Sequence, residues 1–357
     1  MRILDRYIGG VIVRQSCLVF LVLVGLSLSM IFIEELALVG SANYTLGSVL
    51  RFVALSVPRI TYDMFPMIAL IGAILGLSSL ASGSELIVVR ASGVSIARIT
   101  GAVFKIGAVF LLAAIVLGEV ISPWSESEAQ RGRAQDLESS INHNRVYGFW
   151  MRDGHEVVNI REVLPDLSLS KIRIFDFDQD RRLIEVRLAE EGRHHQEGWR
   201  LYNIKKTTYL PHGGATEETF DETDWDTAIT PQMMGAFMIT PDQLSVRQLR
   251  RYITYLRANN QDLRPYELAL WQKLSLPLST AVMVILAIPF VFGSLRVAGG
   301  TGRNLFIGII VGIFFYITNK AFGYIVLGYE AWPTFAGAMF PTAVLFIVAL
   351  LMYRRVA

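Results

Sequence analysis

Three local patterns contain residue types that carry out chemistry in other proteins. Residues 299–303 (Gly-Gly-Thr-Gly-Arg) are glycine-rich like a phosphate-binding loop, but they lack the Gly-Lys-Ser/Thr ending that holds phosphate and Mg²⁺. Residues 25–29 (Gly-Leu-Ser-Leu-Ser) begin like the nucleophile elbow of a serine hydrolase and miss its final glycine. His194, His195 and His212 offer imidazoles, but neighbouring residues of a strand point to opposite faces. We therefore expect no catalytic residue, metal ligand or cofactor in this chain.

Charged side chains inside apolar stretches are further candidates for a functional site. A charge within a membrane-spanning helix is costly, and it usually faces a cavity or a partner charge. Lys320, which follows Asn319, lies well inside its apolar stretch, residues 304–327. Ion pairing within the protein and contact with a ligand both remain open for this group, which contains Arg59, Asp63, Lys105, Glu119, Glu267 and Lys320.

The elements that must position these charges follow from an uneven composition. The chain has 357 residues, 53% of them hydrophobic and only 18% charged, and its mean hydropathy is +0.44. Of the 64 Asp, Glu, Lys and Arg residues, 42 lie in residues 123–265. A charged domain is thus set between two blocks of membrane composition, which excludes a single soluble core. The positive excess belongs to the flanks, so a nucleic-acid partner is not expected. With Cys17 as the only cysteine, an intrachain disulfide is excluded as well.

Six stretches are apolar and long enough to cross a bilayer as helices. They are residues 11–33, 59–81, 99–121, 268–292, 304–327 and 336–352. Because Lys and Arg in short loops mark the cytoplasmic side, the arginines decide the orientation. One set of ends carries Arg2, Arg6, Arg90, Arg98, Arg296, Arg303, Arg354 and Arg355. We therefore predict a membrane α-helical protein with three spans before and three after an external domain, and with both termini in the cytoplasm.

The external domain, residues 123–243, is predicted to be all-β. Residues 156–161, 171–177, 183–188, 199–207 and 218–226 alternate or are rich in β-branched and aromatic side chains, and turn clusters separate them. Strands at this spacing favour a sandwich or a jelly roll. Residues 244–265 then predict an amphipathic connecting helix, because apolar residues recur there at helical spacing. That helix leads back to the last three spans, in residues 266–357.

The short loop between the second and third spans, within the first block of residues 1–122, has the clearest local signals. Ser82 and Glu85 have the spacing of a capping box, and Gly93 suits the left-handed end of a helix. A helix of about two turns in residues 82–93 is not stable alone. It needs either the headgroup region of the membrane or a groove in a partner protein. The two interpretations are a membrane-surface helix and a coupling helix that transmits the motion of a cytoplasmic motor.

Several stretches, in order along nearly the whole chain, carry a resemblance to a known family. They are residues 4–9 (Leu-Asp-Arg-Tyr-Ile-Gly), 65–72, 84–93, 118–123, 147–150 and 292–296 (Phe-Gly-Ser-Leu-Arg). Together with the three-plus-three layout they resemble the LptF/LptG family, the permease subunits of the lipopolysaccharide-export ABC transporter of Gram-negative bacteria. The first and last stretches favour the LptG branch, with the sister LptF branch as the alternative.

The resemblance implies a mechanism and a set of partners. In this family an LptF and an LptG permease sit on a dimer of the ATPase LptB, which binds the ATP and Mg²⁺. Their spans take lipopolysaccharide from the outer leaflet of the inner membrane. ATP-driven closure then passes the lipid through periplasmic β-jelly-roll domains towards LptC and LptA, and the LptC membrane helix packs beside the first span. The chain is accordingly expected to be a multi-pass inner-membrane protein with its large domain in the periplasm.

The resemblance also assigns residues to two sites. Contacts to the ATPase are expected from the coupling region, namely Glu85, Leu86, Val89, Arg90 and Gly93. Lipopolysaccharide contacts are expected from Arg131 and Arg133 just above the third span, because Arg binds phosphate bidentately. Further lipid contacts are expected from spans one and five, at Met30, Phe32, Tyr316, Lys320 and Phe322.

One feature departs from the family pattern. Some members carry lysines at the outer end of the first span, where this chain has Glu34 and Glu35. Phosphate binding at that edge is expected to move to Arg51, Arg59 or Lys320. Two rival functions remain: a membrane enzyme acting on lipid A, which needs a catalytic constellation near an interface, and an envelope scaffold, which leaves the capped cytoplasmic helix unexplained.

Overall fold

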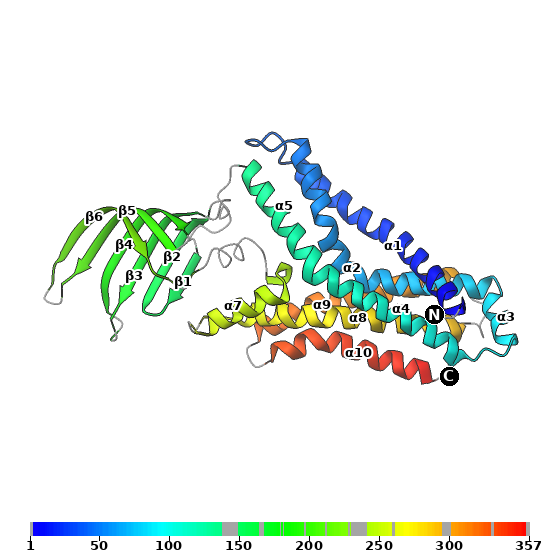
Figure 1. Cartoon of the computed structure of the whole chain (residues 1–357). Coiled ribbons are helices and arrows are strands. Elements are labelled where there is room, and N and C mark those ends of the chain that lie inside the picture. The colour runs from blue at the N-terminus through cyan, green and yellow to red at the C-terminus, as the bar shows by residue number, and fades with distance from the viewer. Residues whose placement is uncertain are drawn as a thin grey trace.

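The computed structural model describes residues 3–137, 149–163, 168–178, 180, 182–195, 198–210, 213–227, 229, 241–258, 261–294, 301–329 and 332–354. Residues 2, 147–148, 212, 295–300 and 355, which entered the sequence arguments above, lie outside these ranges. The described chain consists of an elongated helical bundle with a β-sheet at one end (Figure 1). Both termini and the short helix α3 (Glu85–Ala91) lie at the other end.

Six helices in the described residues are long and apolar enough to cross a membrane, which confirms the six predicted spans. The first half contains α1 (Ile3–Leu36), α2 (Leu46–Ser82) and α4 (Ile96–Val116). The second half contains α8 (Arg264–Ser294), α9 (Thr301–Gly328) and α10 (Thr334–Arg354). Thr45 and Ser48 form a capping box that fixes the start of α2, because each hydroxyl accepts from the backbone N–H of the other residue.

The third span continues further than the sequence indicated. α4 runs through a π-helical turn, η1 (Leu117–Ile121), into α5 (Ser122–Asp136). Residues 123–136, which we had assigned to the β domain, are therefore helical. The predicted span ended at residue 121, just before Pro123, but the helix continues past this proline. The wider π-helical turn lies directly before Pro123, where the proline ring would clash with the preceding turn of a regular α-helix.

The closest helix packing joins α1 to α2. Gly72 and Gly76, one turn apart on α2, lie against Ser16 and Ile12 of α1, and a Cβ atom added at Gly72 would stand 2.5 Å from Ser16 Cα. Small residues at this spacing let two membrane helices approach backbone to backbone. At the end of the bundle that carries the termini, the fully buried Asp5 ties α1 to α4. Its carboxylate binds Arg98 at 2.8 Å and also pairs with Lys105.

In the described part of the β domain, six strands form one antiparallel sheet in which the strands are neighbours in chain order. The strands are β1 (Phe149–Asp153), β2 (Glu156–Val163), β3 (Leu169–Phe177), β4 (Leu183–His195), β5 (Gly198–Tyr209) and β6 (Ala215–Trp225). This confirms the inserted β domain. The sheet is open, and its sequential order differs from the interleaved order of a jelly roll. Strand β1 was not predicted as a strand.

One face of the sheet packs on the connecting helix. The core contains Val158, Ile174 and Trp199 from the strands with Leu249 and Tyr252 from α7 (Val246–Ala258). The Tyr255 hydroxyl donates to the backbone carbonyl of Arg152 at 3.2 Å. Burial raises the pKa of Tyr255 to about 12, so this donor stays protonated. The predicted amphipathic helix is therefore the element that attaches the sheet to the spans.

The predicted capping box before α3 is wrong. Ser82 is the last residue of α2, and its hydroxyl donates to the Ser79 carbonyl. The residue before α3 is Ser84, which has a left-handed backbone and makes no side-chain cap. Because α2 continues to Ser82, this residue cannot cap the start of α3. Gly93 does adopt the expected left-handed conformation, with φ of 86°.

Replacement of Gly72 by Ala should lower the thermal unfolding midpoint of the protein in detergent. The added methyl requires α1 to move away from α2, and such overpacking costs about 1–3 kcal/mol. Gly25→Ala is the matched control, because nothing lies within 4 Å of its Cβ position and Ala favours a helix by about 1 kcal/mol. An equal midpoint for the two variants would contradict the close α1–α2 approach.

Candidate functional site

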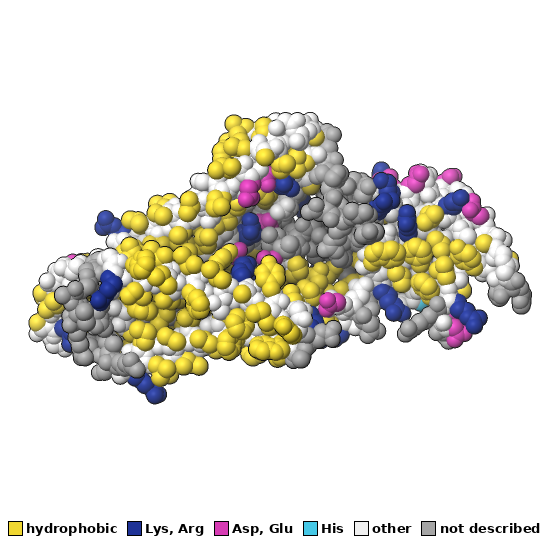
Figure 2. Space-filling model, turned by 180° about the vertical axis from the view of Figure 1, so that it is seen from behind, with side chains coloured by type: hydrophobic (Ala, Val, Ile, Leu, Met, Phe, Trp, Pro, Cys, Tyr) yellow, Lys and Arg dark blue, Asp and Glu magenta, His cyan; other side chains and the backbone are white. Residues whose placement is uncertain are grey.

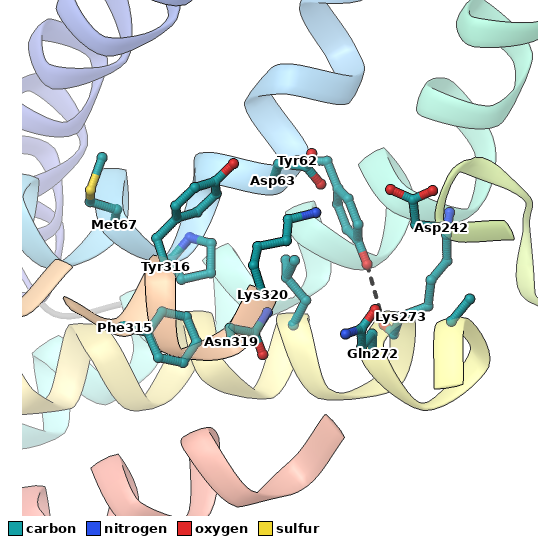
Figure 3. A pocket seen from close by; sticks show the side chains of 13 residues that line it. Tyr62, Asp63, Met67, Asp242, Gln272, Lys273, Phe315, Tyr316, Asn319 and Lys320 are labelled. Atoms are coloured by element: carbon teal, nitrogen blue, oxygen red, sulfur yellow. Dashed lines mark hydrogen bonds between the residues drawn. The ribbon is translucent and has the colours of Figure 1, made fainter. Parts of the chain in front are cut away.

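A polar pocket lies between α2, α8, α9 and the 3₁₀ turn η2 (Pro241–Gln243), inside the region of the spans (Figure 3). Lys320 and Tyr316 of α9, two of the predicted lipid contacts, line it together with Asp63 of α2. Apolar, aromatic and further polar side chains form the rest of the wall. The lining also includes Tyr62, Pro66, Met67, Asp242, Ala269, Gln272, Lys273, Leu276, Phe315 and Asn319.

Opposite charges face one another across this pocket. In Figure 3 the Lys320 ammonium points towards the Asp63 carboxylate, and the Lys273 ammonium points towards Asp242. Asp63, Lys273 and Lys320 lie on apolar helices, where an isolated charge is costly. Asp242, in contrast, is exposed and belongs to the turn η2. The pocket as a whole is close to neutral. An anionic group that entered it would have to compete with Asp63 for Lys320.

Lys273 is held more firmly than Lys320. Its side chain is 6% exposed, and its ammonium donates to the Gly118 carbonyl of η1 at 2.8 Å. The ammonium also lies 5.4 Å from the ring centroid of Tyr62, whose hydroxyl donates to the Lys273 backbone carbonyl. Sequence reasoning missed Lys273, although a single lysine in an apolar stretch of span length was a signal that it could have used.

The helices that flank the pocket leave apolar faces without partners in the described chain. Only 17% of the span window of α1 is buried, and the same is true of α9, whereas 72% of the α2 window is buried. Large apolar side chains on α1 and α9 are exposed, among them Leu21, Leu26, Met30, Phe314 and Ile317. The end of α1 and the start of α2 project from the bundle as an arm (Figure 1). Figure 2 shows acidic and basic side chains in a hollow between this arm and the bundle. The hydrophobic surface of the bundle borders that hollow.

The predicted residues on α1 and α9 have different surroundings. Met30 is 61% exposed, and Phe32 is half-buried on the same helix. Tyr316 is half-exposed and reaches the pocket. Phe322 instead stacks on Phe340 of α10, with ring centroids 4.8 Å apart, so its ring contributes to α9–α10 packing.

The two predicted arginines on α5 also differ. Arg133 donates its Nε to both carboxylate oxygens of Glu35 at 3.1 Å, and the Tyr44 hydroxyl donates to the same carboxylate at 2.7 Å. Glu35 is 8% exposed, and the pKa of Tyr44 lies well above its usual range because of burial and this contact. Arg131 is more exposed and pairs loosely with Glu128 at 3.6 Å. Arg133 is thus partly a structural residue, whereas Arg131 is a surface residue.

The alternative phosphate-binding arginines are placed differently again. Arg59 binds the buried Glu126 of α5 at 3.0 Å. Arg51 is exposed, and its guanidinium packs against the backbone of Gly132 on α5. The outer ends of α2 and α5 are therefore joined by contacts that use these cations. Glu35, which stood out in the sequence as a departure from the family pattern, is the partner of Arg133.

The predicted coupling residues divide between two faces of α3. Leu86 is 2% exposed and belongs to the helical core, and Val89 packs against that core. Glu85 and Arg90 lie on the exposed side, and the Tyr7 hydroxyl donates to Glu85 at 2.7 Å. Sequence reasoning missed Ile87 and Val88, which are 56% and 62% exposed. Helical spacing was the available signal, because residues 86 and 89 share a face that excludes 87 and 88.

Comparison with known proteins places the whole chain in one family. Residues 6–355 match the model of the family described as lipopolysaccharide export system permease LptF/LptG. The chain is 35% identical over 347 residues to the lipopolysaccharide export system permease protein LptG of Haemophilus influenzae, covering 97% of this chain and 96% of the relative. It is 34% identical over 355 residues to the protein of the same name from Escherichia coli, covering 99% and 98%. With six apolar helices, an inserted sheet and a match over nearly its full length, the chain belongs to the LptF/LptG family of lipopolysaccharide export permeases.

Proposed function

We propose that this chain is one half of a permease that extracts lipopolysaccharide from the outer leaflet of the inner membrane and passes it to its β-sheet domain. The observation that carries the proposal is the low burial of α1 and α9 beside a charged pocket. Acyl chains would lie on the apolar faces of these helices. The phosphates would exchange with carboxylates for the cations at Lys320, Arg131 and Arg133.

The exposed apolar faces of α1 and α9 also call for a second membrane subunit. A bare apolar helix face is tolerated in lipid, but half a cavity cannot enclose a lipid on its own. We infer that a sister LptF permease supplies the opposite wall. LptC is the proposed neighbour of α1, and LptA the acceptor that extends the path beyond the sheet.

The end of the bundle opposite the sheet is the proposed binding site of the ATPase. α3 is anchored by Leu86 and presents Ile87 and Val88 between the charged Glu85 and Arg90. This pattern of an apolar centre with charges at its rim is typical of a protein interface. We infer that an LptB dimer docks here and hydrolyses ATP, that this end and both termini are cytoplasmic, and that the sheet is periplasmic. The chain itself would have no ATPase activity.

Charge reversal at Glu85 should weaken co-purification with LptB. Loss of a desolvated charged contact at an interface costs roughly tenfold or more in affinity, so Glu85→Lys should yield little complex in a pull-down from detergent. Tyr7→Phe is the matched control, since it removes the internal hydrogen bond to Glu85 and keeps the carboxylate. Wild-type yields of complex with Glu85→Lys would contradict docking at α3.

Lys320→Gln should reduce the photo-crosslinking of lipopolysaccharide to a probe placed at Tyr316. The pocket loses the cation that faces Asp63, and one cation near a phosphate contributes a factor of roughly five. Arg303→Gln removes one charge from the opposite end of the same helix and should leave the yield unchanged. Equal yields from both variants would remove Lys320 from the lipid path.

Substitutions of the α5 arginines should separate a structural from a lipid-binding role. Arg133→Gln leaves the buried Glu35 without its cation and should lower the unfolding free energy by about 1–3 kcal/mol, measured by thermal unfolding. Arg131→Gln should change stability by less than about 0.5 kcal/mol. It should nevertheless lower lipopolysaccharide crosslinking to a probe at Ala134. An unaltered crosslink yield in the Arg131 variant would leave that residue as solvated surface.

A further inference from the structure

Besides the polar pocket, a groove lies between α4, α7 and α8. Tyr62 and Lys273 line both this groove and the polar pocket described above, so they form the wall between the two. Away from the end formed by α7, the rest of the groove is apolar. Its walls come from Leu111, Ala114 and Ile115 of α4 and from Leu274, Pro277 and Leu278 of α8.

One end of this groove is positively charged. Arg247 and Arg250, one turn apart on α7, line it and are exposed. Within the described residues, neither guanidinium has a carboxylate at ion-pair distance. Glu119, the acid that lines the groove, is committed elsewhere, because it accepts from the backbone amides of Val246 and Arg247 at the start of α7. That contact neutralises the positive helix end and leaves the two arginines for a ligand.

The position of α7 fixes the depth of these arginines. The helix buries Leu249, Tyr252 and Leu256 against the sheet and α8, so its arginine-bearing side cannot turn inward. α7 lies near the sheet end of the spans, beside the start of α8 (Figure 1). The groove therefore runs from apolar membrane depth up to a pair of cations at the level where headgroups lie.

We propose that the groove binds an anionic glycerophospholipid from the leaflet on the sheet side. Its phosphate lies between Arg247 and Arg250, and its acyl chains lie along α4 and α8. Arginine side chains bind phosphate through directed, charge-assisted hydrogen bonds. Each Lys or Arg near anionic lipid also contributes about 1 kcal/mol of electrostatic attraction. The lipid bridges α7 to α4, and it thereby holds the sheet in place against the spans. This site is separate from the substrate path on α1 and α9 and does not rest on the proposed function.

The test is thermal unfolding of the full-length chain in mild detergent during titration with phosphatidylglycerol. A ligand that binds only the folded state raises the unfolding midpoint by mass action. Phosphatidylglycerol should raise the midpoint of the wild type and of Arg251→Gln, a neighbouring exposed arginine that does not line the groove. Arg247→Gln/Arg250→Gln should need roughly 25-fold more lipid for the same shift, about fivefold for each arginine.

Titrations with other ligands and a photo-crosslinking experiment identify the ligand. Phosphatidylcholine and inorganic phosphate should give no shift, because one lacks net charge and the other lacks acyl chains. A photoreactive residue at Leu278 should crosslink to lipid in membranes. The proposal is overturned by equal shifts with phosphatidylcholine, by equal shifts in all variants, by a shift with inorganic phosphate alone, or by crosslinking of Leu278 to a protein in place of lipid.

Discussion

Lys273 stands in an apolar helix, where an ammonium without partners would be strongly destabilising, and the surrounding elements are arranged to satisfy it. The Lys273 ammonium donates a hydrogen bond to the Gly118 carbonyl, in the π-helical turn of the third span. The next residue, Glu119, binds the first amides of α7, the helix that carries the sheet. One short segment thus links α4, α7 and α8. Through α7, this junction connects the β domain to the spans.

Several other cations near the spans are held by carboxylates from distant parts of the chain. Arg133 meets Glu35, Arg59 meets Glu126, and Asp5 meets Arg98 with Lys105. Removing one partner of such a buried pair costs more than the pair contributes, because the other charge stays buried. The cations of these pairs are therefore available to an anionic lipid only by exchange of partners. Arg247 and Arg250 of α7 differ from them, because neither has a carboxylate at ion-pair distance in the described chain.

The sequence predicted the elements well and their contacts poorly. Six spans and an inserted β domain follow from apolar runs of bilayer length and from alternating strands, and both are present. The ends were less certain. The third span was predicted to end at residue 121, yet the helix continues through a π-helical turn to Asp136. Ser82 and Glu85 had capping-box spacing, yet α2 extends to Ser82, so this residue does not cap α3. Local sequence signals fail where a neighbouring helix continues past the end that was predicted for it.

The candidate site shows the same division. Residue types alone nominated Lys320, Tyr316 and the α5 arginines, and the fold places the first two in one pocket with Asp63. No pattern in the sequence pairs Arg133 with Glu35, because 98 residues separate them. Phe322 was nominated as an aromatic of span five, but the turn of α9 directs it onto Phe340. Which face of a helix meets a neighbour depends on packing between helices, and apolar periodicity is weak when lipid covers the remaining faces.

By itself, the sequence determined the membrane class, the three-plus-three layout and the inserted β domain, because hydrocarbon thickness and strand alternation act on short stretches of chain. Its motifs also placed the chain in its family. Only the tertiary structure decided which charges are neutralised, which side of α3 is exposed and that the sheet rests on α7. These outcomes require residues far apart in the chain to meet, and the energy of a buried charge depends on what it meets.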